Sequence, residues 1–234
     1  MDLVDQSKRG APDGHHAGGV KDHVAVGQTA PCDGEIAEIA EVCRRRGLAL
    51  HVDGSRFANA VAALNRSPAD LTWRAGVGAL SFGATKNGAM AAEAVIFFER
   101  AKAADFAFRR KRGGHLFSNM RFLSAQLEAY LEDDLWLKNA RHANRAAGRL
   151  AEGLAAVPGA RLRHPVEANE IFVELPEAVI RGTLADGFEF HRWPDEASTC
   201  IRLVTAFDTD ARSVEAFLAS ARRHGGASTT ARAR

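Results

Sequence analysis

The sequence predicts a protein of the α/β class, and two observations lead to that prediction. Short apolar runs typical of buried strands alternate along the chain with segments whose apolar residues recur at helical spacing. Polar motifs directly follow two of the strand-like runs, at residues 53–56 and 83–88. Because open α/β sheets bind ligands beyond the carboxyl ends of their strands, we expect a site at that edge of the sheet.

The composition is that of an ordinary globular protein. The 234 residues are 46% hydrophobic and 26% charged, which is enough for one large domain or two small ones. A net charge of +2 is too small to indicate a nucleic-acid partner, and no run approaches the roughly 18 apolar residues of a membrane span. The cysteines (Cys32, Cys43 and Cys200) have neither zinc-site spacing nor disulfide density, which favours a reducing cytoplasmic location.

Residues 1–34 differ from the rest of the chain. They mix glycine, proline and scattered charges without a sustained apolar period, which predicts a disordered or loosely attached leader. His15, His16 and His23 fall in this segment. Without cysteines or carboxylates at ligand spacing, they indicate a solvated tail rather than a metal site.

Regular elements are predicted from Glu35 onward. The first is a helix with an apolar stripe that includes Ile36 and Cys43, and Gly47 is placed to end it. Next come a strand at 48–52, a helix at 57–64, and strands at 78–82 and 93–98. Since only about ten residues link the last two strands, we expect them to run antiparallel.

The remaining elements are predicted to form helices and then a second, smaller α/β unit. Residues 101–112 are expected to be helical with a basic end, and residues 118–150 to form one long helix or two broken ones. Beyond Pro158-Gly159 we expect strands at 170–175, near 188–193 and at 200–205, with helices at 178–184 and 210–224. The tail after Gly225 is polar and predicted to fray.

The two polar motifs suit one kind of chemistry. Asp53 and Lys86 are expected at neighbouring strand ends, where a lysine amine can form a Schiff base with pyridoxal phosphate and a carboxylate can pair with its protonated ring nitrogen. Glycine and alanine around Lys86 predict a tight pocket that partly desolvates the amine. The alternatives are a loop lysine in water and an Asp-Gly turn common to many α/β proteins.

The same stretches resemble the low-specificity L-threonine aldolases, of the β-eliminating lyase branch of fold-type I pyridoxal phosphate enzymes. The resemblance runs from about residue 35 to about residue 224. It rests on four segments of this sequence, which are Asp53-Gly54-Ser55-Arg56, Phe82-Gly83-Ala84-Thr85-Lys86-Asn87-Gly88, Arg110-Lys111-Arg112-Gly113-Gly114 and Cys200-Ile201-Arg202-Leu203-Val204-Thr205.

The resemblance implies a role for each candidate residue. Lys86 would be catalytic and carry the cofactor, Asp53 would face the ring nitrogen, and Arg56 would help to fix the ring or the substrate side chain. Arg202 would bind the substrate α-carboxylate through its planar fork, unless it is a solvent-facing residue of an edge strand. Lys111 and Arg112 would reach the cofactor phosphate across a dimer interface, or form a solvated basic helix end.

The domain organisation implied by the resemblance is incomplete. We expect a partial cofactor-binding large domain at 35–136, a small C-terminal α/β domain at 137–225 and a tail at 226–234. A fold-type I large domain has a seven-stranded sheet, of which this chain offers about three strands. Before Glu35 the chain lacks the family's Gly-Thr phosphate turn and its ring-stacking aromatic residue. The chain therefore resembles the C-terminal part of such an enzyme behind an unrelated leader, with bare sheet edges.

Three functions remain open at this stage. The first is a lyase that cleaves threonine-type β-hydroxy-α-amino acids to glycine and an aldehyde. The second is a truncated remnant that keeps the fold and subunit contacts but binds the cofactor poorly. The third is another fold-type I reaction, β-elimination or transamination, because the Lys and Asp pair serves all of these chemistries. Family members are homodimers or homotetramers, so a homo-oligomer is expected.

Overall fold

The structure is a computed structural model that describes residues 33–230, and these residues divide into two compact units at residues 142 and 143. The sequence prediction placed the domain boundary at 136–137, a few residues earlier. Residues 1–32, which carry most of the predicted leader and its three histidines, lie outside the described residues.

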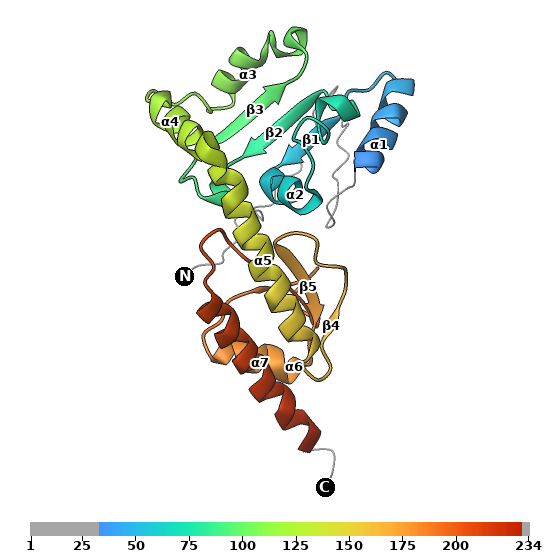
Figure 1. The fold of residues 1–234 in the computed structure, drawn as a ribbon, viewed down its shortest axis with the longest axis vertical. Helices are drawn as coiled ribbons and strands as arrows, with labels where there is room; N and C mark the ends of the chain where they lie inside the picture. The colour runs from blue at the N-terminus through green and yellow to red at the C-terminus, as the bar shows by residue number, and fades with distance from the viewer. Residues whose placement is uncertain (1–32, 231–234) are drawn as a thin grey trace. The chain divides into compact units, whose positions relative to one another are not determined.

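The first unit is built on a three-stranded sheet (Figure 1). Its strands are β1 (His51–Gly54), β2 (Ala79–Gly83) and β3 (Glu93–Phe97), in the spatial order β1-β2-β3. β2 is parallel to β1 and antiparallel to β3. The antiparallel direction predicted for the third strand is therefore confirmed.

The helices of this unit flank its sheet. They are α1 (Asp33–Arg45), α2 (Phe57–Leu64), α3 (Phe106–Arg112), α4 (Met120–Leu131) and the first part of α5 (Leu135–Ala155). In Figure 1, α1 lies on the β1 side of the sheet and α3 on the β3 side. α1 follows its predicted stripe, since Ile36 and Cys43 are buried, and Gly47 has the left-handed φ of 67° that helix-ending glycines adopt.

Packing on one face of the sheet forms the core of the first unit. Leu80 and Phe82 alternate inward on β2, and the Phe82 ring lies 6.3 Å from Phe57 and 5.8 Å from Trp136, centroid to centroid. Both pairs are edge-on, the geometry that aromatic rings prefer. The strand end that precedes Lys86 is thus clamped between α2 and α5.

The strands begin slightly later than the apolar runs suggest. β1 starts at His51 rather than at residue 48, and β2 at Ala79 rather than at 78. Leu50 remains buried without being part of the ladder. Its carbonyl accepts bonds from the Gly78 and Ala79 N–H groups, so the contact between the two segments begins one residue before the assigned strands.

Both outer edges of this sheet are unpaired among the described residues. β1 pairs with β2 alone and β3 pairs with β2 alone. On β3, Val95 and Ile96 are also about 40% exposed. Unpaired strand edges present rows of backbone donors and acceptors that proteins normally cover, so the bare edges expected from the sequence are present in this part of the chain.

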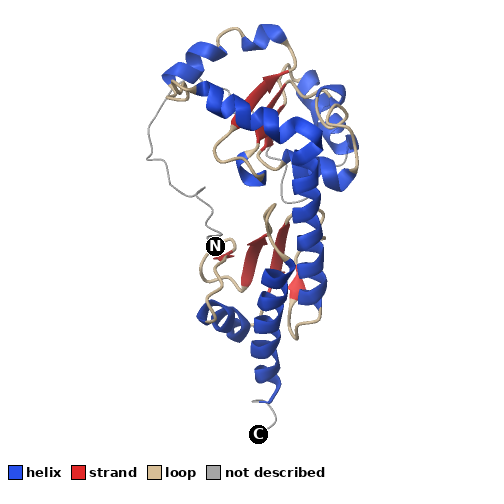
Figure 2. Ribbon diagram, turned by 60° about the vertical axis from the view of Figure 1, so that its left-hand side comes forward, coloured by secondary structure: helices blue, strands red, loops and turns tan. Residues whose placement is uncertain are grey.

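The second unit is an antiparallel sheet with helices on one face (Figure 2). Its strands are β4 (Arg161–Leu162), β5 (Glu170–Glu174), β6 (His191–Arg192) and β7 (Cys200–Val204), ordered β4-β5-β7-β6. α6 (Glu177–Ala185), α7 (Ala211–Thr230) and the second part of α5 cover it. The core between them includes Leu154, Ile171, Ile180, Ile201 and Leu218.

Several predicted helix boundaries are corrected by the structure. The helix predicted at 101–112 is a 3₁₀ turn at Arg100–Ala103 followed by α3. Of the two forms predicted for 118–150, the structure has the broken one: α4 and α5 are separated where Asp133 and Asp134 have left-handed φ angles of 50° and 56°. α7 continues to Thr230, so the fraying predicted after residue 225 is wrong over those residues.

No described helix combines the length and hydropathy that crossing a bilayer requires. Among the described residues there is also no cluster of three or more histidine, cysteine or acidic side chains placed to hold a metal ion.

One carboxylate ties the end of α6 to α7. Asp186 Oδ2 accepts hydrogen bonds from Ser220 Oγ and Arg223 Nη2, and lies 3.0 Å from His224 Nε2. The Ser220 hydroxyl, with His224 and Arg223, holds the pKa of Asp186 at about 2, below its ordinary 3.8. Hydrogen bonds to the ionised form account for this direction.

Because its folded pKa is lowered, Asp186 stabilises the fold above about pH 4, and this contribution is lost as the pH falls toward 2. We expect Asp186→Asn to unfold more easily than the wild type near pH 6, with a difference that shrinks toward pH 2. Urea unfolding at a series of pH values measures this. Asp208→Asn, at an exposed position, is the charge-matched control, and a pH-independent difference for Asp186→Asn would contradict the assignment.

Candidate functional site

The parallel pairing of β1 and β2 brings the first two predicted motifs to one edge of the sheet. Asp53 pairs with Ser81 and Gly54 with Phe82, so the two strands end nearly level. Arg56 follows β1 directly and precedes α2, while Lys86 lies in a 3₁₀ turn, Thr85–Asn87, that follows β2. The predicted grouping of Asp53, Arg56 and Lys86 at neighbouring strand ends therefore matches the backbone arrangement.

Two glycines let the strand ends approach closely. A Cβ on Gly83 would stand 2.8 Å from the Ser55 Cα, and one on Gly54 would stand 2.6 Å from the Ser81 carbonyl oxygen. Both distances are shorter than real Cβ contacts allow. The turn that carries Asp53 can pack against the end of β2 only because neither position has a side chain.

Asp53 is held in an exposed position at the end of β1. Its Oδ1 accepts a hydrogen bond from the Ser55 N–H at 3.1 Å, the Asx-turn geometry that Asp-Gly sequences favour. Its side chain points to the same face of the strand as that of His51, two residues earlier. The carboxylate is therefore presented beyond the sheet rather than buried in the core.

His51 is bonded to the neighbouring strand. Its Nε2 lies 2.8 Å from Ser81 Oγ, and the imidazole is half-buried. The contact gives the imidazole a hydrogen-bond partner within the sheet. The pair joins the first residue of β1 to the middle of β2.

The Lys86 loop is anchored by the next residue along the chain. Asn87 is buried, and its Nδ2 donates to Tyr130 Oη at 2.6 Å and to the Trp136 carbonyl at 2.8 Å. The Asn87 carbonyl accepts a bond from Asn139 Nδ2 at 2.9 Å. Burial raises the pKa of Tyr130, so its hydroxyl stays protonated and can serve in this network.

The sequence did not predict that Asn87 and its partners anchor the Lys86 loop. A polar residue within a loop of glycines and alanines was the available signal, but nothing local shows that its partners come from about fifty residues downstream. The network fixes the backbone on both sides of Lys86, because Ala84 is also fully buried.

The predicted desolvation of Lys86 is not found in this chain. Its side chain is exposed, although Gly83, Ala84 and Asn87 around it are buried. The small residues fill the space beneath the loop, so the amine extends beyond them. The loop positions the lysine without enclosing it.

Lys111 and Arg112 are not placed at the strand ends. They are the last two residues of α3, on the β3 side of the sheet, and both are exposed. The structure thus groups them with the solvated basic helix end that the sequence left open. Their proposed contact with a phosphate on a partner subunit stays a prediction.

Arg202 belongs to the second unit and lies in an interior strand. β7 is flanked by β5 and β6, so the alternative of a solvent-facing edge position is wrong. Arg202 Nε donates to Glu170 Oε1 at 3.1 Å, and Nη2 donates to the same oxygen. The guanidinium predicted to bind a carboxylate thus already contacts one within the protein.

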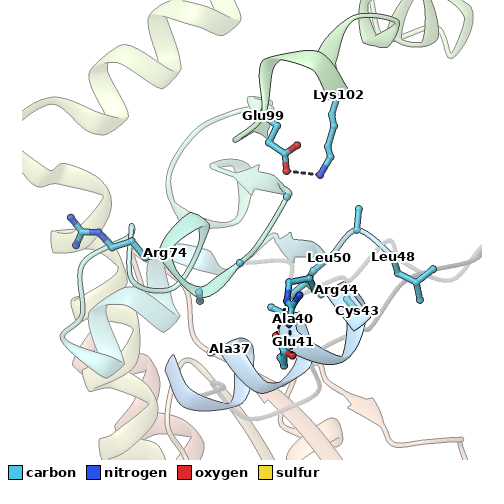
Figure 3. Close-up of a pocket in the computed structure, with 14 residues that line it drawn as sticks. Ala37, Ala40, Glu41, Cys43, Arg44, Leu48, Leu50, Arg74, Glu99 and Lys102 are labelled. Atoms are coloured by element: carbon cyan, nitrogen blue, oxygen red, sulfur yellow. Dashed lines mark hydrogen bonds and ion pairs between the residues drawn. The ribbon is translucent and has the colours of Figure 1, made fainter. Parts of the chain in front are cut away.

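A cavity of about 400 Å³ lies at the opposite ends of β1 and β2 (Figure 3). Its charged side chains pair with one another: Arg44 with Glu41 at 2.7 Å, and Lys102 with Glu99 at 2.6 Å. Arg74 points away from them in Figure 3. Because these groups do not converge on a common point, the cavity lacks the polar arrangement of a catalytic site.

A second cavity, of about 640 Å³, lies over the core face of the sheet in the first unit and is mainly apolar. Its lining includes Leu80 and Phe82 of β2, Ile96 of β3 and Leu127 and Leu131 of α4. The side chains of Asp53 and Lys86 are not part of this lining.

Comparison with known proteins gives the same family that the motifs at the strand ends resemble. A sequence model described as "Beta-eliminating lyase" matches residues 22–178, about two thirds of the chain. The chain belongs to the β-eliminating lyase family. Members of this family and the threonine aldolases depend on pyridoxal 5′-phosphate.

Two curated proteins similar to this chain are low-specificity L-threonine aldolases. The one from Pseudomonas aeruginosa is 47% identical over 180 residues, and the one from a Pseudomonas species is 42% identical over 188 residues. These alignments cover 77% and 80% of this chain but 51% and 54% of the relatives. The chain therefore spans about half the length of the curated relatives it matches.

Solved structures give the same fold class. A Leishmania major threonine aldolase superposes with a TM-score of 0.74 at 30% identity, over 82% of this chain and 56% of its own. A Sphingomonas wittichii serine palmitoyltransferase superposes with a TM-score of 0.58 at 14% identity, over 83% of this chain and 51% of its own, which speaks for the fold alone. The predicted fold, α/β of pyridoxal phosphate fold type I, is confirmed.

The residues at the strand ends fit part of what this cofactor needs. A carboxylate near the end of β1 and a lysine in the turn after the parallel strand β2 are the groups that suit the ring nitrogen and the aldehyde. The glycines at positions 54 and 83 let the two strand ends pack against each other, which brings the two motifs to one edge. The fit covers the ring end of the cofactor, while a phosphate cradle is not formed by these residues.

Asn87→Ala is expected to destabilise the first unit by about 2–3 kcal/mol, because it leaves the Tyr130 hydroxyl and the Trp136 carbonyl buried without their shared donor. Gln126→Ala removes bonds that Gln126 Oε1 accepts from the exposed Met90 and Ala91 N–H groups, and should cost less than about 1 kcal/mol. Denaturant unfolding of both variants measures the difference. Equal losses would show that Asn87 is not the main anchor.

Proposed function

We propose that the chain is, or derives from, a pyridoxal phosphate-dependent carbon-carbon lyase that cleaves threonine-type β-hydroxy-α-amino acids to glycine and an aldehyde. The observation that carries this proposal is that Asp53, near the end of β1, and Lys86, in the turn after β2, lie at the same edge of two adjacent parallel strands. The relatives named L-threonine aldolase, at 47% and 42% identity, give the substrate class.

Each candidate residue has a distinct task in this proposal. The Lys86 amine holds the cofactor covalently, and its fixed loop sets where that bond lies. The Asp53 carboxylate keeps a proton on the ring nitrogen, because a negative charge there favours the protonated form. When bound, pyridoxal phosphate supplies the electron sink into which a Cα–Cβ bond can release its electrons.

The arginines would bind and orient the substrate. Arg202 presents two N–H groups of its guanidinium in one plane, the geometry that grips an α-carboxylate. Arg56, half-buried between β1 and α2, is proposed to fix the ring or the substrate side chain. Lys111 and Arg112 are proposed to bind the cofactor phosphate across a subunit interface, as exposed cations at the end of α3.

A second candidate function is a remnant that keeps the fold but holds the cofactor weakly. Two observations favour it: the chain covers about half of its relatives, and the Lys86 side chain is exposed rather than enclosed. An exposed amine loses the low-dielectric surroundings that strengthen electrostatic contacts in a closed site. Cofactor binding separates this candidate from the first.

We expect pyridoxal phosphate to attach to the purified chain at Lys86. Reduction with borohydride followed by peptide mass spectrometry should locate the modified residue, and a visible absorption band should accompany attachment. Lys86→Ala should abolish both signals, while Lys102→Ala, which removes a lysine from the opposite cavity, should keep them. Random modification of several lysines, or none, would support the remnant.

Where attachment is found, the products identify the reaction. Glycine and acetaldehyde formed from threonine select the aldolase, whereas pyruvate from serine or a keto acid would select β-elimination or transamination. Asp53→Asn should retain attachment at Lys86 but lower turnover on the order of 100-fold, since it removes a preorganised charge near the reacting system. Unchanged turnover in Asp53→Asn would remove Asp53 from the mechanism.

We also propose that the chain works as a homodimer or homotetramer in a reducing compartment such as the cytoplasm. Phe108, Phe117 and Phe122, in and around α3 and α4, expose more than half of their surface, which is unusual for aromatic side chains of a monomer. Cys43 and Cys200 are buried and not in disulfides, consistent with a reducing location.

A further inference from the structure

Arg202 is held by a carboxylate of its own chain. Its Nε and Nη2 both donate to Glu170 Oε1, across the adjacent strands β5 and β7. The side chains are largely buried, at 11% exposure for Arg202 and 20% for Glu170. The partner of the guanidinium is thus an acceptor of the kind that the proposed substrate would offer.

A second ion pair on the same strand shows that this arrangement is not a general feature of the sheet. Glu174, four residues after Glu170 and on the same face of β5, pairs with Arg161 and Arg163. Those two arginines are 68% and 49% exposed, so this pair lies at the surface and is screened by water. The Glu170 pair lies inside the unit, where charge contacts are stronger.

The backbone around the pair is fixed on both strands. Asn169 Nδ2 donates to the Thr205 carbonyl at 2.7 Å, and Thr205 Oγ1 donates to the Ala143 carbonyl at 2.8 Å. The flanking residues Ile171, Ile201 and Leu203 are buried in the core on the opposite face. Because neither strand can shift easily, Glu170 stands in a set position beside the guanidinium, and only side-chain rotation can separate them.

We propose that Glu170 is a competing carboxylate that limits binding of carboxylate ligands to Arg202. The inference rests on the proposed function, because the ligand would be the α-carboxylate of an amino acid substrate. A substrate carboxylate must displace Glu170 from the guanidinium, so part of its binding free energy is spent on breaking an existing charge-assisted pair. Glu170 thereby acts as a positioning residue that sets substrate affinity.

The test uses acetate as the carboxylate probe and acetamide as its neutral counterpart. Titration of ¹⁵N-labelled chain, followed by the Arg202 Nε–H resonance, reports binding at this guanidinium without any cofactor. Glu170→Gln keeps the side-chain shape but removes the charge, and should bind acetate on the order of tenfold more tightly than the wild type. Glu174→Gln is the matched control and should leave acetate binding at Arg202 unchanged.

The outcomes are distinct. Tighter acetate binding in Glu170→Gln alone, with no response to acetamide, supports the proposal. Equal acetate affinity in wild type and Glu170→Gln overturns it, as would an equal gain in Glu174→Gln. Should Glu170→Gln not fold, Glu170→Asp is the second variant, because its shorter side chain holds the carboxylate farther from the guanidinium: acetate binding tighter than in the wild type supports the proposal, and unchanged acetate binding overturns it.

The same variants separate this inference from the proposed function. In cofactor-loaded chain, the glycine concentration that half-saturates the visible spectral change should fall on the order of tenfold in Glu170→Gln. Acetate competition without cofactor attachment at Lys86 would leave the inference standing while the lyase proposal fails. Cofactor attachment at Lys86, with glycine and acetate affinities unaffected by Glu170→Gln, would do the reverse.

Discussion

The parallel pairing of β1 with β2 is the constraint on which the candidate site depends. Asp53 and Lys86 are 33 residues apart in the sequence, and the register Asp53 to Ser81 places both at the same edge. A shift of the register by one residue would turn Asp53 toward the core face and separate the two groups. The glycines at the strand ends and the His51–Ser81 contact reinforce this register from inside the sheet.

Buried residues on both sides of Lys86 hold the loop that carries this exposed side chain. The residue before the turn and the residue after Lys86 are buried, whereas Lys86 itself is exposed. Buried polar groups must be hydrogen-bonded, so Asn87, Tyr130 and the Trp136 carbonyl are tied into one set of contacts. Disturbing these contacts would lower the stability of the fold. The same contacts fix the backbone next to Lys86 and so determine its position.

The second unit contains a largely buried ion pair between two neighbouring strands. Its interior strand β7 carries an arginine, and the sheet supplies a carboxylate for it from β5. Removing either partner would leave the other partly buried and uncompensated, which explains why the two occur together. The first unit, in contrast, leaves both outer strand edges unpaired among its described residues, in keeping with a chain that spans about half the length of its relatives.

The sequence by itself determined the fold class, the order of most elements and the site motifs. Apolar periodicity indicated α2 and the antiparallel β3 correctly, because these signals are local and follow from burial of one face. Tertiary structure alone decided the anchor at Asn87, the exposure of Lys86 and the Glu170 partner of Arg202. These features depend on contacts between residues 32 to 52 positions apart, which no local pattern encodes.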